Sequence, residues 1–256
     1  MTKRVPRHLP RMLEPIPVQS WYSQQLLKLI GLWEIAAKPR LEIILPLMVA
    51  QHEQGSGDWV QGVENLSKWI DASHHVKDIA TIAAERANSW NDFQLGKVVE
   101  EAVHRPLPPL PKRKLEQTTK EFVAENVSLI KGVSETTASS IRDTVYRLVS
   151  EGKGTEEITQ ALIGKRIEKG PFKKAETRVR LIAFDQLGKL TAQLNEQKQL
   201  SMGVEEYVWR TLLDGRVREA HLSREGRIYR WDEPPSDGHP GEPINCRCYA
   251  EPRFGE

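Results

Sequence analysis

Hydrophobic residues recur at intervals of three and four over most of the first two hundred positions. That spacing is typical of helices with one apolar face. The sequence therefore predicts a series of helices over residues 21–35, 59–70, 76–103, 122–130, 141–148 and 173–200. Pro39 and Pro46 are expected to interrupt the chain after the first of them, because proline has no N–H to donate within a helix.

The period changes near residue 205, where apolar and polar side chains begin to alternate. Tyr207 and Trp209 fall on one side of this segment and Val208 on the other, as in a strand. Further short strands are expected at 227–231 and 244–250. The predicted fold class is therefore α+β, with a mainly helical body and a small C-terminal α+β module that a zinc ion would staple together.

Proline-rich stretches suggest where the chain divides. Four prolines in residues 1–20 favour an extended arm, because each fixes φ and removes a donor. The stretch RPLPPLPKRK, residues 105–114, is typical of a semi-rigid linker. The expected organisation is an arm (1–20), an N-terminal helical region (21–104), the linker (105–114), a second helical region (115–203) and the C-terminal module (204–256).

Composition and charge exclude some classes of protein without selecting one. Hydrophobic residues make up 39% of the chain, which is enough for a folded core. There is no run of about 18 apolar residues, so no membrane span is expected, and the basic N-terminus lacks the apolar segment of a secretory signal. With 37 basic and 35 acidic residues, the net charge of +2 does not by itself imply nucleic acid.

Basic residues are nevertheless concentrated between Lys165 and Arg180. Such a window is usually the solvated face of a helix. The alternative is contact with DNA phosphates by charge alone, without reading of sequence. The candidate DNA-binding residues are Lys165, Arg166, Lys173, Lys174, Arg178 and Arg180.

The two cysteines stand too close together for an ordinary disulfide. Cys246 and Cys248 would close a very small ring with poor geometry. Together with His221 and His239 they form a donor set that a tetrahedral Zn²⁺ accepts. The alternative is that two small buried cysteines lie beside hydrogen-bonded histidines.

Other polar residues near the cysteines admit structural and catalytic interpretations. If Asp214 caps a short helix, then Asp214, Arg218 and His221 share one face and form a network. Trp209 and Trp231 are expected to pack the module, although they would also suit base stacking. An acid–base pair of His221 with Asp214, or a nucleophilic Cys246, is conceivable chemically. Without a phosphate-binding loop, G-x-S-x-G or H-E-x-x-H, no enzyme is expected.

Several segments together resemble a known family. They are RLIAFDQLGKLTAQLNEQ (180–197), GVEEYVWRTLLDGRVREAH (203–221), GRIYRW (226–231) and PGEPINCRCYAEP (240–252). This discontinuous series resembles the phage Mu F-like head morphogenesis family of minor head, or minor capsid, proteins. Many relatives carry C-x-x-C where this chain has Arg218 and His221, and a histidine and C-x-C follow. The resemblance therefore supports His221, His239, Cys246 and Cys248 as metal ligands. It also implies that Arg218 occupies the first ligand position of those relatives.

The resemblance implies a structural role rather than an enzymatic one. The first hypothesis is a minor head protein of a Mu-like tailed phage or prophage, acting in procapsid assembly in the host cytoplasm and located in the procapsid or virion. Its expected partners are portal, major capsid or scaffold protein, with no membrane and no small-molecule substrate. The alternative is a zinc-stabilised, sequence-independent binder of packaged double-stranded DNA. A toxin-like hydrolase that uses Asp214 and His221 is a third hypothesis.

Overall fold

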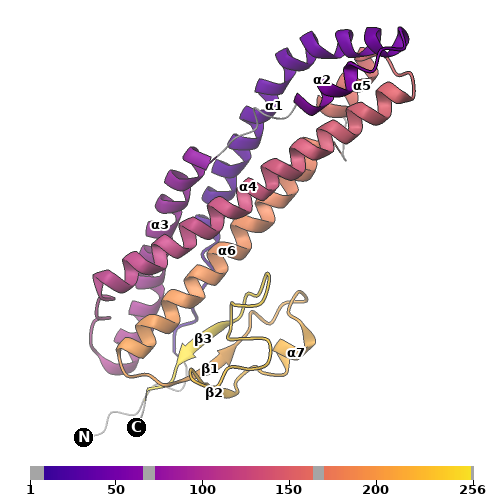
Figure 1. The fold of residues 1–256 in the computed structure, drawn as a ribbon. Helices are drawn as coiled ribbons and strands as arrows, with labels where there is room; N and C mark the ends of the chain where they lie inside the picture. Colours follow the sequence, from indigo (N-terminus) through magenta and orange to yellow (C-terminus); the bar gives the residue numbers. More distant parts are fainter. Residues whose placement is uncertain (1–8, 66–72, 164–169, 255–256) are drawn as a thin grey trace, which may run out of the picture. The chain divides into compact units, whose positions relative to one another are not determined.

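A computed structural model describes residues 9–65, 73–163 and 170–254 (Figure 1). Seven helices and three strands lie in these residues. The helices are α1 (Ile16–Glu53), α2 (Trp59–Asn65), α3 (Ser73–Val103), α4 (Lys112–Ser150), α5 (Thr155–Ile163), α6 (Pro171–Ser201) and α7 (Glu219–Leu222). The strands are β1 (Glu206–Arg210), β2 (Ile228–Arg230) and β3 (Tyr249–Pro252). The predicted class, a mainly helical α+β fold with a small C-terminal sheet, is confirmed.

Helix α1 differs from its prediction at both ends. It begins at Ile16, within the expected extended arm, and continues through Pro39 and Pro46 to Glu53. The predicted interruption is therefore wrong. Both prolines lie on the exposed side of the helix, where water can solvate the carbonyls that lose their partners. The opposite side is buried at regular helical spacing through Trp33, Ala37, Leu41, Leu45 and Met48.

The chain forms two compact units. One contains residues 1–22, 79–124 and 183–256, and the other contains 23–78 and 125–182. Four long helices, α1, α3, α4 and α6, contribute residues to both units. Each unit therefore combines residues from several of the five segments expected from the sequence.

Glycines end the two helices that flank α5. Gly152, with a φ of 73°, follows α4, and its N–H donates to the Val149 carbonyl. Gly203, with a φ of 77°, follows α6 in the same way and donates to Leu200. This left-handed conformation is accessible to glycine at little cost. At Gly203 the turn leads directly from α6 into the sheet.

The sheet is antiparallel with the order β2-β1-β3. In the central strand, Tyr207 and Trp209 are fully buried, so the alternation predicted from the sequence is confirmed. The third strand begins later than expected, at Tyr249. Residues 243–246 form a turn instead, in which Cys246 donates its N–H to the Pro243 carbonyl and Asn245 has a φ of 54°, and residues 247–248 lead irregularly into β3.

Buried polar side chains of α6 hold the sheet. Asn195 and Gln199 both donate to the Ala250 carbonyl of β3 at 2.9 Å. These residues belong to the first unit, in which the sheet lies beside the C-terminal half of α6 (Figure 1). Hydrogen bonds of buried groups are costly to lose, because the freed carbonyl has no water to replace them. Helix α6 therefore fixes the position of the strand that follows the two cysteines.

Candidate metal centre

A buried group of one histidine and two cysteines lies in the C-terminal module. His221 comes from α7, and Cys246 and Cys248 come from the loop before β3. All three are less than a tenth exposed, and their ligand atoms lie within 4.8 Å of one another. They share a core with Tyr207, Trp209, Trp231 and Ala250.

The distances within this group suit a tetrahedral zinc ion. The Nδ1 atom of His221 is 3.4 Å from the sulfur of Cys246 and 3.6 Å from that of Cys248. Zinc bonds of about 2.3 Å to sulfur and about 2.0 Å to nitrogen, at a tetrahedral angle, place those atoms about 3.6 Å apart. One imidazole and two thiolates are also the soft donors that zinc prefers. The three residues therefore fit the ion.

The second nitrogen of His221 has a partner of its own. Its Nε2 is 3.0 Å from Oδ2 of Asp237, whose other oxygen accepts a hydrogen bond from Arg224 at 2.6 Å. Burial raises the pKa of the Asp237 carboxyl. The hydrogen bonds from Arg224 and His221 together outweigh that rise, so the pKa lies below its usual value. An ionised carboxylate orients the imidazole with Nδ1 directed at the sulfurs, as in many zinc sites.

The two thiols are in unequal environments. A hydrogen bond from Cys248 lowers the pKa of Cys246 to about 6, against the opposing effect of burial. The backbone N–H of Gly241 also donates to the Cys246 sulfur at 3.4 Å. The same pairing raises the pKa of Cys248. The pairing therefore favours the thiolate, the form that binds a metal, at Cys246 over Cys248.

His239 lies outside this group. Its Nδ1 is 2.8 Å from the hydroxyl of Tyr207, and its ring packs against Tyr207 and Trp231. Of the four candidate ligands from the sequence, the structure thus brings together His221, Cys246 and Cys248 and places His239 elsewhere in the core. Residue type and spacing along the chain do not distinguish the two histidines, and in the structure both are buried beside aromatic rings.

The predicted network of Asp214, Arg218 and His221 is wrong. Helix α7 begins only at Glu219, so these three residues do not share a helical face. Asp214 pairs with Arg247 at 2.6 Å, and this hydrogen bond lowers the pKa of the Asp214 carboxyl. Arg218 donates instead to the Ile244 carbonyl at 2.5 Å. Arg218 therefore holds the turn before Cys246 by a hydrogen bond.

Trp209 and Trp231 pack the module. The Trp209 ring meets the His221 ring edge-on at 5.3 Å, and Arg224 lies over its face at 4.8 Å. Trp231 contacts Tyr207 at 4.3 Å between ring centroids. Because both indoles are buried, neither offers a free face for a base to stack on.

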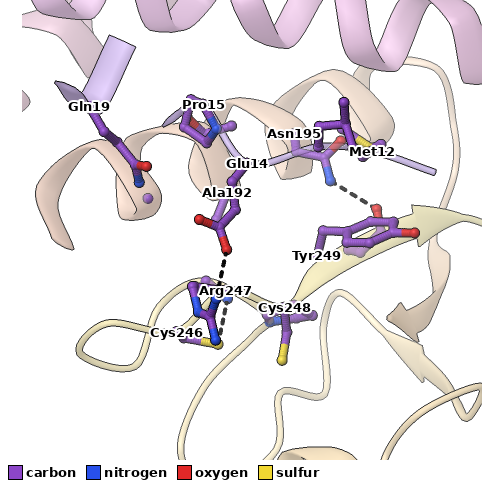
Figure 2. Close-up of a pocket in the computed structure, with 16 residues that line it drawn as sticks. Met12, Glu14, Pro15, Gln19, Ala192, Asn195, Cys246, Arg247, Cys248 and Tyr249 are labelled. Atoms are coloured by element: carbon purple, nitrogen blue, oxygen red, sulfur yellow. Dashed lines mark hydrogen bonds and ion pairs between the residues drawn. The ribbon is translucent and has the colours of Figure 1, made fainter. Parts of the chain in front are cut away.

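A small cavity of about 60 Å³ adjoins the cysteines (Figure 2). Glu14, which precedes α1, points into it toward Arg247 at 3.6 Å. Burial raises the pKa of the Glu14 carboxyl, although Arg247 opposes that rise. Arg11 also reaches the module, donating to the Thr211 carbonyl at 3.1 Å. The segment before α1 is therefore attached to the loop that carries both thiols.

Gly241 also lines the cavity, and its substitution tests how tightly the loop that carries Cys246 and Cys248 is packed. A Cβ at Gly241 would lie 2.4 Å from that of Ala192, and the residue has a φ of 97°. Gly241→Ala is therefore expected to cost about 2 kcal/mol of unfolding free energy, from strain and overlap together. Thermal unfolding measures it. Gly215→Ala is the control, because no heavy atom lies within 4 Å of its added Cβ; equal destabilisation by both substitutions would contradict the prediction.

The structure describes only part of the basic window at residues 165–180 and places its members in different surroundings. Lys165 and Arg166 lie outside the described residues, and Lys173 forms an ion pair with Glu176 at 2.9 Å. Lys174 and Arg178 are exposed one turn apart on α6, and Arg180 is also exposed. Lys174 and Arg178 line a groove of about 580 Å³ in the second unit. Its wall on α4 combines the apolar Leu129 and Val133 with small and hydroxyl residues: Ser128, Gly132, Thr136, Thr137 and Ser140.

A buried lysine that was not predicted from the sequence lies among polar side chains of α3. Lys198 is fully buried, and its Nζ contacts Asn88 and Asn91 at 2.9 Å and Asp92 at 2.6 Å. Burial lowers the pKa of Lys198, and Asp92 opposes that effect. The sequence signal for this cluster is the presence of Asn195, Lys198 and Gln199 on the mainly apolar, buried face of α6.

Comparison with known proteins agrees with the resemblance. Residues 139–251 match the family described as Phage Mu protein F like protein, so the predicted resemblance is confirmed over that range. An uncharacterized protein of Haemophilus influenzae is 32% identical over 134 residues, which cover 51% of this chain and 28% of that relative. The chain thus matches little more than a quarter of the relative's length. No solved structure matches the chain.

The matched range contains the sheet, the metal centre and the basic window. No helix in the described part of the chain combines the length and the apolar character that crossing a bilayer requires.

Proposed function

We propose that this protein is a minor head protein of a tailed phage or prophage and acts in head assembly by binding portal, major capsid or scaffold protein. The observation that carries the proposal is the match of residues 139–251 to the Mu F-like family. Its setting would be the host cytoplasm during assembly and the procapsid or virion afterwards. A role in attachment requires a module of fixed shape, and the buried cluster of His221, Cys246 and Cys248 provides a means of fixing it.

Deletion of the gene from the phage or prophage tests this role directly. Heads are expected to be missing, aberrant or non-infectious, and a copy supplied in trans should restore them. Electron microscopy and plaque counts measure the result. Infectious particles of normal form and number from a clean deletion would overturn the proposal. Mass spectrometry of purified particles and procapsids would identify the stage at which the protein is present.

The metal centre would act as a staple within this role. Zinc held by His221, Cys246 and Cys248 would join α7 to the loop before β3, two segments with little apolar surface of their own. Three protein ligands leave one position of a tetrahedral ion for water or for a group from a partner. His239 remains an alternative fourth ligand only if its hydrogen bond to Tyr207 is exchanged for the metal.

Asp237 permits a test of the zinc proposal that leaves all three ligands in place. Asp237→Asn removes the charge that orients His221, and is expected to weaken zinc binding by about 10-fold to 100-fold. Competition with a chromogenic chelator measures the affinity. Asp232→Asn is the matched control, because Asp232 pairs with the exposed Arg230 and does not touch the cluster. An unchanged affinity in the Asp237 variant would mean that the carboxylate does not support a bound metal.

A second function, sequence-independent contact with packaged DNA, is supported by the groove beside α6. Lys174 and Arg178 line it together with hydroxyl groups and without any acidic residue. Reversing both charges, Lys174→Glu with Arg178→Glu, is expected to reduce the slope of log affinity against log salt by about 2. Fluorescence titration of duplex DNA measures it. An equal reversal at Lys112 and Arg113 controls for net charge, and identical slopes in both variants would exclude the groove as the binding site.

A further inference from the structure

The outer face of α1 carries a stripe of exposed apolar side chains. Ile35 and Ile43 are 71% and 69% exposed, and Leu32 and Leu47 are 57% and 61% exposed. Pro39 and Pro46 lie exposed in the same stripe. All these positions belong to the second unit, and they extend over about 22 Å at the helical rise of about 1.5 Å per residue.

This stripe makes α1 apolar on both of its sides. The inner side is buried through Trp33, Leu41 and Leu45, so the exposed residues are not needed for the fold of the unit. A continuous exposed patch of this kind usually marks an interaction surface.

The spacing of the stripe points to a second copy of the same helix. From Leu32 to Ile35, Pro39, Ile43 and Pro46 the steps are three, four, four and three residues. That series is the same when it is followed from either end. Two copies laid antiparallel about a two-fold axis near Pro39 therefore match Leu32 with Pro46 and Ile35 with Ile43, while Leu47, at the edge of the stripe, falls opposite Gly31.

The charges beside the stripe favour the same arrangement. Lys38 and Glu42 are exposed one turn apart on one flank of the stripe, near its midpoint. Antiparallel pairing about the same axis brings Lys38 of one copy to within about 3 Å, along the helix, of the level of Glu42 of the second copy. Arg40, on the other flank, donates to the Ala36 carbonyl of its own helix at 2.7 Å.

We infer that α1 is a self-association surface, through which two copies of this chain pair antiparallel in a two-fold dimer. The apolar stripe supplies the buried area, and the Lys38–Glu42 contacts, formed twice, set the direction. This surface is separate from the metal centre and from the groove beside α6. The dimer does not depend on the proposed role in head assembly.

Charge exchange at one contact tests the inference on the full chain. Lys38→Glu or Glu42→Lys alone turns both attractive contacts into repulsive ones, and each is expected to weaken dimerisation about tenfold or more. The double variant, Lys38→Glu with Glu42→Lys, restores both contacts and should dimerise like the unchanged protein. An equimolar mixture of the two single variants should form heterodimers, because each copy then carries the charge that the other lacks. Sedimentation equilibrium measures all four samples.

Several outcomes would overturn the inference. A monomeric unchanged protein at tens of micromolar would show that a different partner covers the stripe. A dimer insensitive to both single reversals would form through another surface, and failure of the double exchange to restore pairing would exclude the antiparallel register. Ile43→Ser is a second disruption that removes apolar area without altering charge. A dimer unaffected by Ile43→Ser would equally exclude the stripe.

Discussion

Replacing both Cys246 and Cys248 by serine is expected to abolish zinc binding and to lower the melting temperature by about 10 °C. Structural zinc stabilises small modules by many kcal/mol, and even a net loss of about 4 kcal/mol produces such a shift in a chain of this size. We expect the C-terminal module to depend on the cluster, because its sheet is small and its cysteines lie outside the strands.

Elemental analysis of the purified, untagged protein gives the zinc content of each variant. Addition of a strong chelator should lower the melting temperature of the unchanged protein and leave that of the double serine variant unaltered. His239→Gln is the informative comparison. His239 lies outside the cluster in the structure, so this variant should bind zinc like the unchanged protein. Well under one zinc per chain in the unchanged protein, with no response to chelator, would contradict the prediction.

Lys198→Ala is expected to destabilise the first unit by about 2 to 3 kcal/mol, because it removes a buried charged donor, whereas the Asp92 side chain is 45% exposed and water can solvate its carboxylate. The Lys198 amine is fully buried, and it is the shared donor for Asn88, Asn91 and Asp92. Asn91 is also fully buried, and removal of Lys198 leaves its amide oxygen without the ammonium group that donates a hydrogen bond to it. Chemical denaturation measures the loss.

Two further variants separate charge from packing at this position. Lys198→Met keeps most of the side-chain volume, so the difference between the methionine and alanine variants reports packing, and the cost of the methionine variant reports the lost hydrogen bonds. Lys173→Ala, on the same helix but with a half-exposed side chain, should cost less than about 1 kcal/mol. If Lys198→Ala cost no more than Lys173→Ala, the cluster would not stabilise the fold.

Local sequence patterns predicted most elements because their causes are local. The helix expected at 173–200 is observed as α6, Pro171–Ser201, since apolar spacing and Gly203 mark its course and its end. The alternation at Tyr207 and Trp209 likewise predicted β1. The same logic failed at Pro39 and Pro46, because a proline on the solvated side of a well-packed helix costs less than the contacts on the buried side contribute.

The candidate site could be predicted as a set of residue types but not as a geometry. Cys246, Cys248 and a histidine were recognisable because their chemistry is rare and specific. The partner of His221 was not, since Asp237 lies sixteen residues away in an irregular loop that has no periodic signal. The same reason explains the misplaced Asp214, because its actual partner, Arg247, is thirty-three residues away in the chain.

By itself, the sequence determined the helical body, the central strand, the resemblance to Mu F-like proteins and the donors available for a metal. These depend on spacing along the chain, which is fixed by covalent geometry. Tertiary structure alone decided that His221 rather than His239 meets the thiols, that Lys198 is buried among amides, and that one side of α1 remains uncovered. Each of these depends on which segments pack together, a balance of burial and hydrogen bonding between residues far apart in the chain.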